Sequence, residues 1–411
     1  MKIYLVGGAV RDQLLGLKVK DRDFVVVGAT PQQMLDQGFR PVGQDFPVFL
    51  HPKSHEEYAL ARTERKTSKG YQGFAFNTDV SVSLEEDLAR RDLTINAMAM
   101  DMTSHEIIDP YKGQSDLKNK VLRHVSNAFL EDPVRILRLA RFSSRYHHLG
   151  FTVHPKTQKL MQKMVANGEV DALVAERVWQ ELKQALNETT PSAFIKTLRA
   201  CGALKILFPE FNQLFGVPQT AKWHPEIDTG IHCMMAMDQA AHLANDTAFA
   251  VFNHDLGKGI TPKEILPSHK GHEAAGVPLV EDVCKRLKVP SLHKKLAIHV
   301  CRWHLHSHTA FDLRAGTIHK LFLSTAAYQQ PLQFDKFLQA CQADATGRLH
   351  HENKAYPQAD YLRKCLKSAQ NIDVKALIDQ GFSDAALGIQ INQQRIKQIK
   401  RVKLSQPFVL R

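Results

Sequence analysis

The chain has 411 residues, more than one hydrophobic core usually serves, so its length predicts two or more domains. With 44% hydrophobic and 23% charged residues and no repeat of fixed period, the composition excludes a disordered chain and a solenoid. A net charge of +12 favours a polyanionic partner, above all nucleic acid, because each lysine or arginine that neutralises a phosphate releases counterions.

No feature of the sequence indicates a membrane span or a secretory signal. No apolar stretch approaches the ~20 residues that cross a bilayer. The N-terminal segment turns to glycine directly after Val6, which is too early for a signal peptide. The six cysteines are scattered without a CxxC pair, as is typical of buried, reduced thiols. We therefore expect a cytoplasmic protein with no membrane partner.

Residues 1–110 alternate short β-rich runs at 3–6 and 24–27 with helical and glycine-containing segments, which predicts an α/β head. Beyond residue 110 amphipathic patterns predict an all-α remainder. The helix patterns include 134–146, 174–186 and 191–204. We divide this remainder into a neck at 111–227, a histidine-rich domain at 228–330 and a tail at 331–411 with a basic amphipathic segment at 395–403.

Two glycines near the N-terminus indicate a phosphate-binding turn. Gly7 and Gly8 follow a predicted strand and precede a helix, so their amides and the helix N-terminus can approach a phosphate closely. Arg11 would add a positive charge. A plain tight turn is the alternative for the glycine pair taken alone.

Asp21 and Asp23 run into the second predicted strand, at 24–27. Residues i and i+2 of a strand point to the same side, so the two carboxylates are expected to lie together. They repel each other unless a cation joins them, and Mg²⁺ is the natural one because it prefers hard oxygen ligands and bridges carboxylates to nucleotide phosphates. A solvated pair of acids is the alternative.

Arg90 and Arg91 precede a further amphipathic run. A surface ion pair would explain them equally well in isolation. Beside a glycine turn and two acids, we expect Arg91 to contact an incoming triphosphate, because the guanidinium fork matches phosphate geometry.

These motifs together resemble those of the class II tRNA nucleotidyltransferases, in particular the multifunctional CCA-adding enzymes of the bacterial type. The resemblance runs through essentially the whole chain. The matching segments are GGAVRD (7–12), DRD (21–23), RRDLTINAM (90–98), EDPVRILRLARF (131–142), AKWHPEIDTGIH and HDLGKG. It implies a polymerase-beta-like head followed by helical neck, body and tail, and an enzyme that adds C, C and A to the 3′ end of tRNA from CTP and ATP.

The neck motif would choose the nucleotide. Asp132, Arg135, Arg138 and Arg141 recur every three residues along one face of a predicted helix. Cytosine and adenine both present an amino donor beside a ring-nitrogen acceptor, so one carboxylate and one guanidinium can read both. The resemblance implies that Asp132 accepts from the amino group, that Arg135 donates to the ring nitrogen, and that Arg138 and Arg141 contact the nucleotide. A salt-bridged helix is the alternative.

One position departs from the family pattern. Related enzymes often carry a third acid where this chain has Ala59. Glu57 and Asp79 are both candidates to replace it, and the sequence does not decide between them.

The histidine-rich domain resembles an HD-type phosphohydrolase. His232, the pair His254 and Asp255, and then His272 and His304 are expected to surround a divalent metal. The resemblance implies phosphatase, 2′,3′-cyclic phosphodiesterase and 2′-nucleotidase activities with Ni²⁺ or another divalent ion. HD domains usually close the site with a late aspartate, and Leu305 follows His304 where a second His-Asp pair would be expected. A scaffold with weak hydrolysis is the alternative.

The expected partners are CTP, ATP and the acceptor arm of tRNA, which the basic tail would bind by shape and phosphate contacts. We expect a monomer or homodimer. Three other functions are possible: a class II poly(A) polymerase, a phosphohydrolase with a degenerate head, and a tRNA-binding module without turnover. The intact DRD motif and Arg91 argue against a degenerate head.

Overall fold

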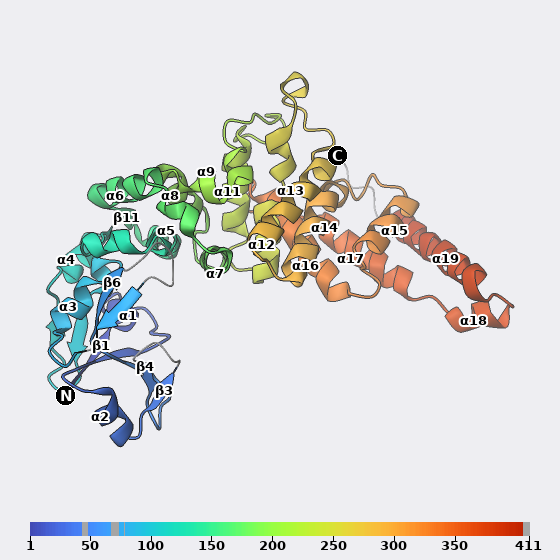
Figure 1. The fold of residues 1–411 in the computed structure, drawn as a ribbon. Coiled ribbons are helices and arrows are strands. Elements are labelled where there is room, and N and C mark those ends of the chain that lie inside the picture. Colours follow the sequence, from blue (N-terminus) through green and yellow to red (C-terminus); the bar gives the residue numbers. More distant parts are fainter. Residues whose placement is uncertain (43–47, 67–73, 78, 406–411) are drawn as a thin grey trace. The chain divides into compact units, whose positions relative to one another are not determined.

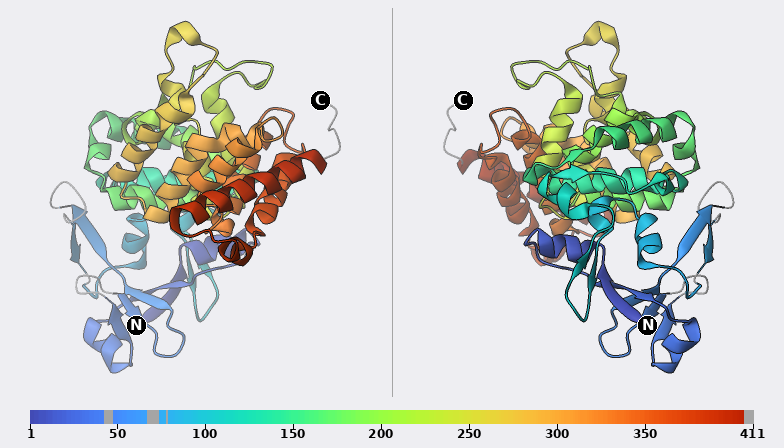
Figure 2. Two further views of the ribbon diagram at one scale, coloured as in Figure 1. Left: turned by 90° about the vertical axis from the view of Figure 1, so that its right-hand side faces the viewer. Right: turned by 90° about the vertical axis from the view of Figure 1, so that its left-hand side faces the viewer.

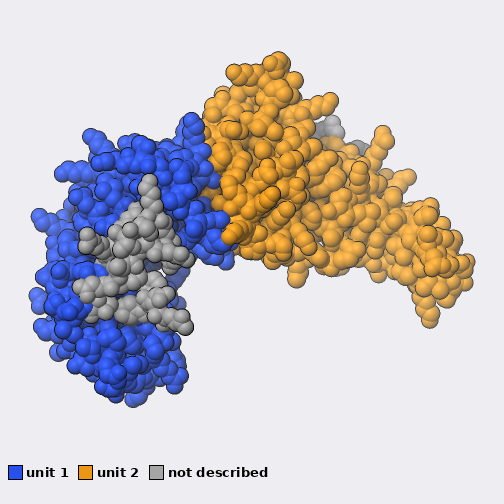
Figure 3. Space-filling view, viewed as in Figure 1, with its two compact units in different colours: residues 1–185, 193–207 blue, residues 186–192, 208–411 orange. Residues whose placement is uncertain are grey.

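The computed structural model describes residues 1–42, 48–66, 74–77 and 79–405, and the side chains of these residues except 64–66 and 74–77. The chain forms two compact units (Figure 3). Unit 1 comprises residues 1–185 and 193–207, and unit 2 comprises residues 186–192 and 208–411. The two units are described separately below.

Unit 1 is built on a mixed sheet of seven strands in the order β3-β4-β5-β2-β1-β8-β9, which lies in the N-terminal part of the unit (Figures 1 and 2). Its strands are β1 (Lys2–Val6), β2 (Asp23–Val27), β3 (Arg40–Val42), β4 (Val48–Leu50), β5 (Glu57–Leu60), β8 (Ala99–Asp101) and β9 (Ile107–Ile108). The predicted runs at 3–6 and 24–27 are β1 and β2. A separate hairpin is formed by β6 (Thr63–Lys66) and β7 (Phe74–Asn77).

The strand register brings three loops to one end of the sheet. Strands β1 and β2 are antiparallel with Val6 opposite Asp23, and β2 and β5 are parallel with Asp23 beside Glu57. The last residue of β1 and the first residues of β2 and β5 therefore lie at the same end of the sheet. The glycine turn that follows β1 is placed beside the acidic residues by this pairing.

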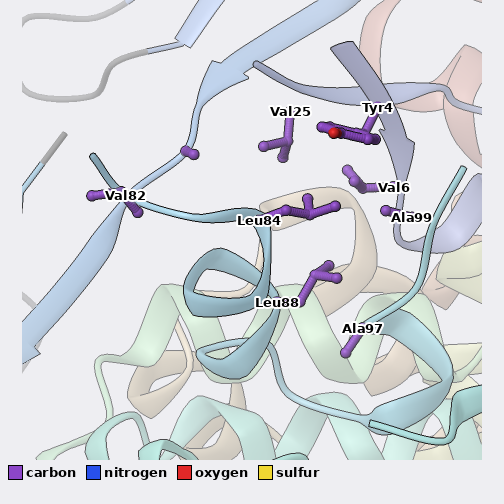
Figure 4. Close-up of a cluster of buried hydrophobic side chains, with 9 residues drawn as sticks. Tyr4, Val6, Val25, Val82, Leu84, Leu88, Ala97 and Ala99 are labelled. Atoms are coloured by element: carbon purple, nitrogen blue, oxygen red, sulfur yellow. The ribbon is translucent and has the colours of Figure 1, made fainter. Parts of the chain in front are cut away.

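Helix α3 (Leu84–Ala89) packs against the centre of the sheet (Figure 4). Its N-terminus is capped by Ser83, whose side chain accepts from the amide of Glu86 while the Glu86 carboxylate accepts from the amide of Ser83. Leu84 and Leu88 are buried, and they pack in one cluster with Tyr4, Val6, Val25, Val82, Ala97 and Ala99. This core holds β1 and β2 in place beneath the site.

The other helices of unit 1 are short. They are α1 (Gly8–Leu14), α2 (Pro31–Asp36), η1 (Thr94–Asn96), α4 (Gly113–Lys118), η2 (Asn127–Glu131), α5 (Val134–Tyr146), η3 (His147–Leu149), α6 (Pro155–Ala166), η4 (Glu169–Ala172), α7 (Ala175–Ala185), α8 (Ser192–Cys201) and α9 (Ala203–Leu207). The helices predicted at 134–146 and 174–186 correspond to α5 and α7. The helix predicted at 191–204 is interrupted, because Gly202 has a φ of +87° and separates α8 from α9. A two-residue parallel pair, β10 (Val121–Leu122) and β11 (Thr152–Val153), also lies within the predicted helical region.

The described part of unit 2 is built from helices and the loops that join them, with one isolated β-bridge between Pro218 and Asp228. Its helices are α10 (Pro209–Asn212), α11 (Thr229–Gln239), α12 (Asn245–Asn253), η5 (Leu256–Ile260), η6 (Lys263–Ile265), α13 (His272–Arg286), α14 (Ser291–His308), α15 (Ala315–Ser324), α16 (Pro331–Thr346), α17 (Pro357–Gln370), α18 (Val374–Asp379) and α19 (Asp384–Ser405). The α/β head and the predominantly helical remainder confirm the predicted fold class.

Two glycines allow an unusually close approach inside unit 2. A Cβ atom on Gly257, in η5, would lie 2.0 Å from the carbonyl oxygen of His272, and one on Gly276 would lie 2.6 Å from Sγ of Cys301. Only glycine fits these positions, so η5 can lie directly against α13. This contact brings the segment that follows Asp255 next to His272.

All six cysteines are free and buried, as predicted. No helix in the described part of the chain is both long enough and apolar enough to cross a membrane.

Candidate active sites of the two units

The predicted head and neck residues line one cavity of about 700 Å³ in unit 1. These residues come from the glycine turn, the paired acids, the loop before η1 and helix α5. They are Gly7, Gly8, Arg11, Asp21, Asp23, Arg90, Arg91, Asp132, Arg135, Arg138 and Arg141. The structure therefore brings together residues that lie as far apart as positions 7 and 141.

Asp21 and Asp23 present two carboxylates to this cavity. Burial raises the pKa of Asp23 and the negative charge of Asp21 raises it further, whereas the positive charge of Arg91 opposes both effects. No described residue donates a hydrogen bond to either carboxylate. Two adjacent acids without donors fit a divalent cation that takes oxygen ligands, such as Mg²⁺.

The geometry distinguishes the candidates for the third acid. Ala59 lines the cavity but carries no ligand atom. Glu57 lines the same cavity and is the register partner of Asp23. Asp79 is not among the residues that line the cavity, and its Oδ1 accepts hydrogen bonds from the amide and the hydroxyl of Ser81 at 2.8 and 2.7 Å. Its position in the cavity lining and its pairing with Asp23 therefore both favour Glu57 over Asp79 as the third acid.

Gly7 is required by the path of the chain at the turn. Its φ is +69°, which is unfavourable for residues with a Cβ atom, and a Cβ would lie 2.9 Å from Nη1 of Arg91. Arg91 is held from the other side by Asp87, whose Oδ2 lies 3.4 Å from its Nη2. The glycine turn and Arg91 are thus packed directly against each other at the edge of the cavity.

The sequence predicted that Arg11 contacts a phosphate, but in the structure its side chain is buried among protein partners. Its side chain is buried and donates to Oδ1 of Asp12 at 2.9 Å and to the side-chain oxygen of Asn96. Its guanidinium also lies over the rings of Phe142 and Tyr146, at 5.2 and 5.3 Å from their centroids. In this conformation Arg11 joins α1 to α5, in addition to lining the cavity.

Two of the neck arginines form ion pairs within unit 1. Arg138 donates to Oδ2 of Asp92 at 2.8 Å, and Arg141 donates to Oε2 of Glu181 at 2.7 Å. Burial raises the pKa of Asp92, but Arg138 and the Asn96 amide outweigh burial and hold the pKa well below its usual range. These pairs fix the face of α5 that borders the cavity.

Asp132 and Arg135 lie at the start of α5. Asp132 precedes the helix, and its Oδ1 accepts from the amide of Val134 at 3.0 Å while Oδ2 lies 3.6 Å from Nη1 of Arg177. Arg135 is buried in the first turn and lines the cavity. The carboxylate and the guanidinium expected to read a base therefore line the same cavity as the paired acids.

The histidines of unit 2 gather around two buried aspartates. His232 lies on α11, His254 and Asp255 follow α12, His272 begins α13 and His304 lies on α14. The Nε2 atom of His254 is 3.2 Å from Oδ2 of Asp255, and the Nε2 atom of His272 is 3.2 Å from Oδ1 of the same residue. All five predicted ligands are buried and lie in one cluster.

The structure adds a candidate metal ligand that the sequence analysis did not identify. Asp344, on α16, places Oδ1 3.1 Å from Nε2 of His232 and 3.6 Å from Nε2 of His254. It lies beyond residue 330, where we expected the domain to end, and it supplies the late carboxylate that Leu305 cannot. Leu305 itself is exposed. The feature that could have identified Asp344 from the sequence was an acidic residue far along the chain, on a helix rich in buried residues.

The electrostatics of this cluster fit a divalent metal ion. Burial lowers the pKa of His254, but Asp255 and Asp344 outweigh burial and raise it to about 9 in the metal-free protein. Oδ1 of Asp255 and Nε2 of His254 are buried without a hydrogen bond of normal geometry among the described residues, and Oδ2 of Asp255 lies against the Lys258 ammonium at 2.7 Å. Buried atoms of this kind are costly unless a cation binds them.

A cavity of about 730 Å³ opens beside the cluster and carries several cationic groups. Lys258 is buried, with Nζ 2.7 Å from Oδ2 of Asp255 and 2.6 Å from Oε1 of Gln219. Arg348 lies 3.6 Å from Oδ1 of Asp344 through Nη2. Trp223 is 59% exposed on the wall of the same cavity. The cavity thus offers positive charge and an aromatic surface next to the cluster.

The fold and the two sites define a nucleotidyltransferase with a polymerase-type head, joined to an HD-type domain. Matches to protein families agree with this class. They are the poly A polymerase head domain over residues 3–123, the probable RNA and SrmB-binding site of polymerase A over 150–215, and the HD domain over 229–344.

Comparison with whole proteins identifies the family. The multifunctional CCA protein of Teredinibacter turnerae is 56% identical over 408 residues, which cover 99% of both chains. That of Hahella chejuensis is also 56% identical, over 98% of this chain and 96% of its own. The chain therefore belongs to the multifunctional CCA proteins, which confirms the resemblance inferred from the motifs.

Solved structures show the same fold at low sequence identity. The Thermotoga maritima CCA-adding enzyme in complex with tRNA aligns with a TM-score of 0.62 at 21% identity, over 98% of this chain and 91% of that one. The Bacillus stearothermophilus CCA-adding enzyme in complex with CTP aligns with a TM-score of 0.64 at 21% identity, over 97% and 89% of the two chains.

Proposed function

We propose that this protein adds C, C and A to the 3′ end of tRNA from CTP and ATP in the cytoplasm, without a nucleic-acid template and with release of pyrophosphate. One observation carries the proposal: the paired acids, the glycine turn and the start of α5 border a single cavity. The groups for phosphoryl transfer and those for base selection can therefore act on one bound nucleotide.

In the head, Asp21, Asp23 and Glu57 are the proposed ligands of Mg²⁺. Bound there, the metal would lower the pKa of the attacking 3′ hydroxyl and stabilise the leaving pyrophosphate. Arg91 lies beside the glycine turn and would bind the triphosphate. The amides of the turn and the N-terminus of α1 add donors for the same phosphates.

In the neck, Asp132 and Arg135 are the proposed readers of the base. The carboxylate would accept from the amino group of cytosine or adenine, and the guanidinium would donate to the ring nitrogen. Uracil and guanine would leave two polar groups mismatched, at roughly 1–3 kcal/mol each, which corresponds to rejection on the order of a hundredfold or more. Arg138 and Arg141 border the same cavity and, paired with Asp92 and Glu181, would hold the helix in register.

In unit 2, the proposed reaction is hydrolysis of 2′,3′-cyclic and terminal phosphates, such as those on damaged RNA ends. The buried histidines and aspartates would hold Ni²⁺ or another divalent ion, which supplies Lewis-acid activation when bound. Lys258 and Arg348 would bind the phosphate, and Trp223 offers a face on which a base can stack.

The tail provides exposed cations for tRNA, although part of its basic segment is used within unit 2. Nζ of Lys403 donates to the carbonyl oxygens of Phe311 and Leu313, and Arg395 lies 3.9 Å from the ring centroid of Tyr328. The exposed cations of α19 are Lys397, Lys400 and Arg401. We propose these three for contacts with the phosphates of the acceptor arm.

The test is incorporation of labelled CTP and ATP, separately and together, into a tRNA that lacks its last three nucleotides. Two C followed by one A, with termination, would support the proposal. A long ladder of A would indicate a poly(A) polymerase, and phosphate release from RNA ends without incorporation would assign the activity to unit 2. Asp21→Ala should abolish incorporation while tRNA binding persists, which a binding module without turnover would not show.

A further inference from the structure

We infer that Gln219 binds the substrate phosphate in unit 2, by donating a hydrogen bond from Nε2 to a phosphate group that the Lys258 ammonium also contacts. This inference rests on the proposed phosphohydrolase and adds to it a substrate-binding residue. The ligand class is a phosphate ester, either a 2′,3′-cyclic phosphate or a terminal monoester, because both present phosphate oxygens that accept hydrogen bonds.

The backbone fixes Gln219 at the wall of the cavity in unit 2. Gln219 is 3% exposed and lines the cavity of about 730 Å³. Its main-chain amide donates to the carbonyl oxygen of Ile227 at 2.7 Å. The carbonyl oxygen of Pro218 lies 3.0 Å from Nε2 of His269, and Nδ1 of that ring lies 2.7 Å from the Thr261 hydroxyl. The main chain on both sides of the Gln219 side chain is therefore held in place.

Lys258 determines which way the Gln219 amide group faces. Nζ of Lys258 lies 2.6 Å from Oε1 of Gln219. An ammonium group can only donate, so the amide atom that faces it must be the oxygen. The NH₂ group is therefore directed away from Nζ, and the usual ambiguity between the oxygen and the nitrogen of an amide does not arise here.

Nε2 of Gln219 is a buried donor without an acceptor. It has no hydrogen-bond partner among the described residues. Leaving a buried N–H group unpaired is costly, and buried polar side-chain atoms are nearly always paired. Because Gln219 borders a cavity, a bound ligand can supply the missing acceptor.

Lys258 supplies a second donor directly beside the amide. Of its three N–H groups, one is directed at Oδ2 of Asp255 at 2.7 Å and one at Oε1 of Gln219. Lys258 also lines the cavity, so its third N–H group remains for a ligand. Because Asp255 offsets the charge of Lys258, the neutral amide adds a hydrogen bond where charge alone binds an anion weakly.

Two further unpartnered atoms on the cavity wall fit the same class of ligand. Nε of Arg348 is buried without a partner among the described residues, although Nη1 donates to the carbonyl oxygen of Trp223 at 3.4 Å. Oε1 of Gln358 is a buried acceptor in the same situation. Donors on Gln219 and Arg348 suit phosphate oxygens, and the acceptor on Gln358 suits a ribose hydroxyl. Together these atoms match a nucleotide.

Two substitutions separate donation to the phosphate from the alternative roles of Gln219. Gln219→Glu keeps an oxygen beside Lys258 but removes the donor and adds a negative charge. Gln219→Met is uncharged and of similar length, but it removes both the donor and the acceptor. A residue that only positions Lys258 would be impaired by methionine alone, and repulsion by added charge would appear with glutamate alone. Donation to the phosphate predicts a loss in both variants.

The full-length protein loaded with Ni²⁺ is assayed for hydrolysis of 2′,3′-cyclic AMP and of 2′-AMP. We expect both variants to raise KM for each substrate by roughly tenfold or more, and to raise the inhibition constant of inorganic phosphate by a similar factor. Nickel per chain, measured by mass spectrometry, and CCA addition should be unchanged. Gln380→Glu and Gln380→Met are the matched controls, because Gln380 is exposed in unit 2 and lies outside the cavity lining.

The parental KM in either Gln219 variant would overturn the assignment of Gln219 and leave the proposed hydrolase intact. A raised KM together with loss of nickel would also overturn it, because the effect would then come from the histidine and aspartate cluster. If the unsubstituted protein hydrolysed neither substrate, the proposed hydrolase itself would be refuted, and the inference with it. The two failures are therefore distinguishable.

Discussion

Nε and Nη2 of Arg138 both lie 2.8 Å from Oδ2 of Asp92, and this pair joins helix α5 to the residue that follows Arg91. The other oxygen of Asp92 accepts from the amide of Leu93 at 2.8 Å and from the side-chain amide of Asn96 at 2.9 Å. Asp92 is thus bound on both sides. Helix α5 and the loop that carries Arg91 are held together by one buried carboxylate.

Asp92→Asn should lower the free energy of unfolding at pH 7 by about 1–3 kcal/mol, because it leaves the Arg138 guanidinium without its charged partner. The folded protein holds the pKa of Asp92 below its unfolded value. Its stabilisation is therefore complete above the unfolded pKa of about 3.9 and is lost as the pH falls through the folded pKa. Denaturation curves at pH 7 and near pH 3 should show the difference between the two proteins shrinking in acid. A difference independent of pH would contradict this assignment.

Glu57→Gln should reduce CMP incorporation by at least tenfold without impairing folding, because it removes a negative ligand beside Asp23. Asp79→Asn is the matched control, since Asp79 was the other candidate acid and lies outside the cavity lining. Single-turnover incorporation into a tRNA lacking CCA, measured at several Mg²⁺ concentrations, checks both variants. Equal losses in the two variants would mean that the pairing of β2 with β5 does not identify the third acid of the site.

Arg135→Ala should lose the choice of base before it loses turnover, because the ring-nitrogen donor disappears while Asp21 and Asp23 are unaffected. The ratio of kcat/KM for CTP over UTP should fall by roughly a hundredfold. Arg135→Lys keeps the charge but loses the guanidinium fork, and should have an intermediate ratio. Full preference for CTP and ATP in the alanine variant would show that another group reads the base.

Gly257→Ala should disable the HD-type site by a steric clash, without removing any candidate ligand. The added Cβ would lie 2.0 Å from the carbonyl oxygen of His272, so η5 and α13 must separate and Asp255 must move away from His272. Hydrolysis of 2′,3′-cyclic AMP and nickel binding should both fall by more than tenfold, whereas CCA addition should persist. Gly316→Ala is the matched control, because a Cβ at Gly316 would meet no atom within 4 Å. Equal activity of both variants would refute the requirement that η5 and α13 lie in close contact.

Separate removal and return of metals should distinguish the two sites. After chelation both activities should be lost, because the carboxylates of each site are proposed to bind a cation. Mg²⁺ should restore incorporation, and Ni²⁺ should restore hydrolysis of the cyclic phosphate. Asp255→Asn should block only the second recovery. If Asp255→Asn also blocked incorporation, the two sites would not be independent.

The sequence by itself determined the features that depend on neighbouring residues. The glycine pair after β1, the two acids Asp21 and Asp23 beside the start of β2, and the helix at 134–146 follow from local conformational preference and side-chain spacing. The motifs around them also identified the family, and the HDLGKG segment predicted that His254 and Asp255 lie in a histidine and aspartate cluster, as they do.

Only the tertiary structure decided the relationships that depend on register and on packing between distant segments. The parallel pairing of β2 and β5 places Glu57 beside Asp23, and the packing of α16 against α11 brings Asp344 to His232, 112 residues earlier. The pairing of Arg138 with Asp92 is likewise set by packing. Spacing along the chain fixes which side chains share a face, but which faces meet is decided by the burial of the whole core, and no local pattern contains that information.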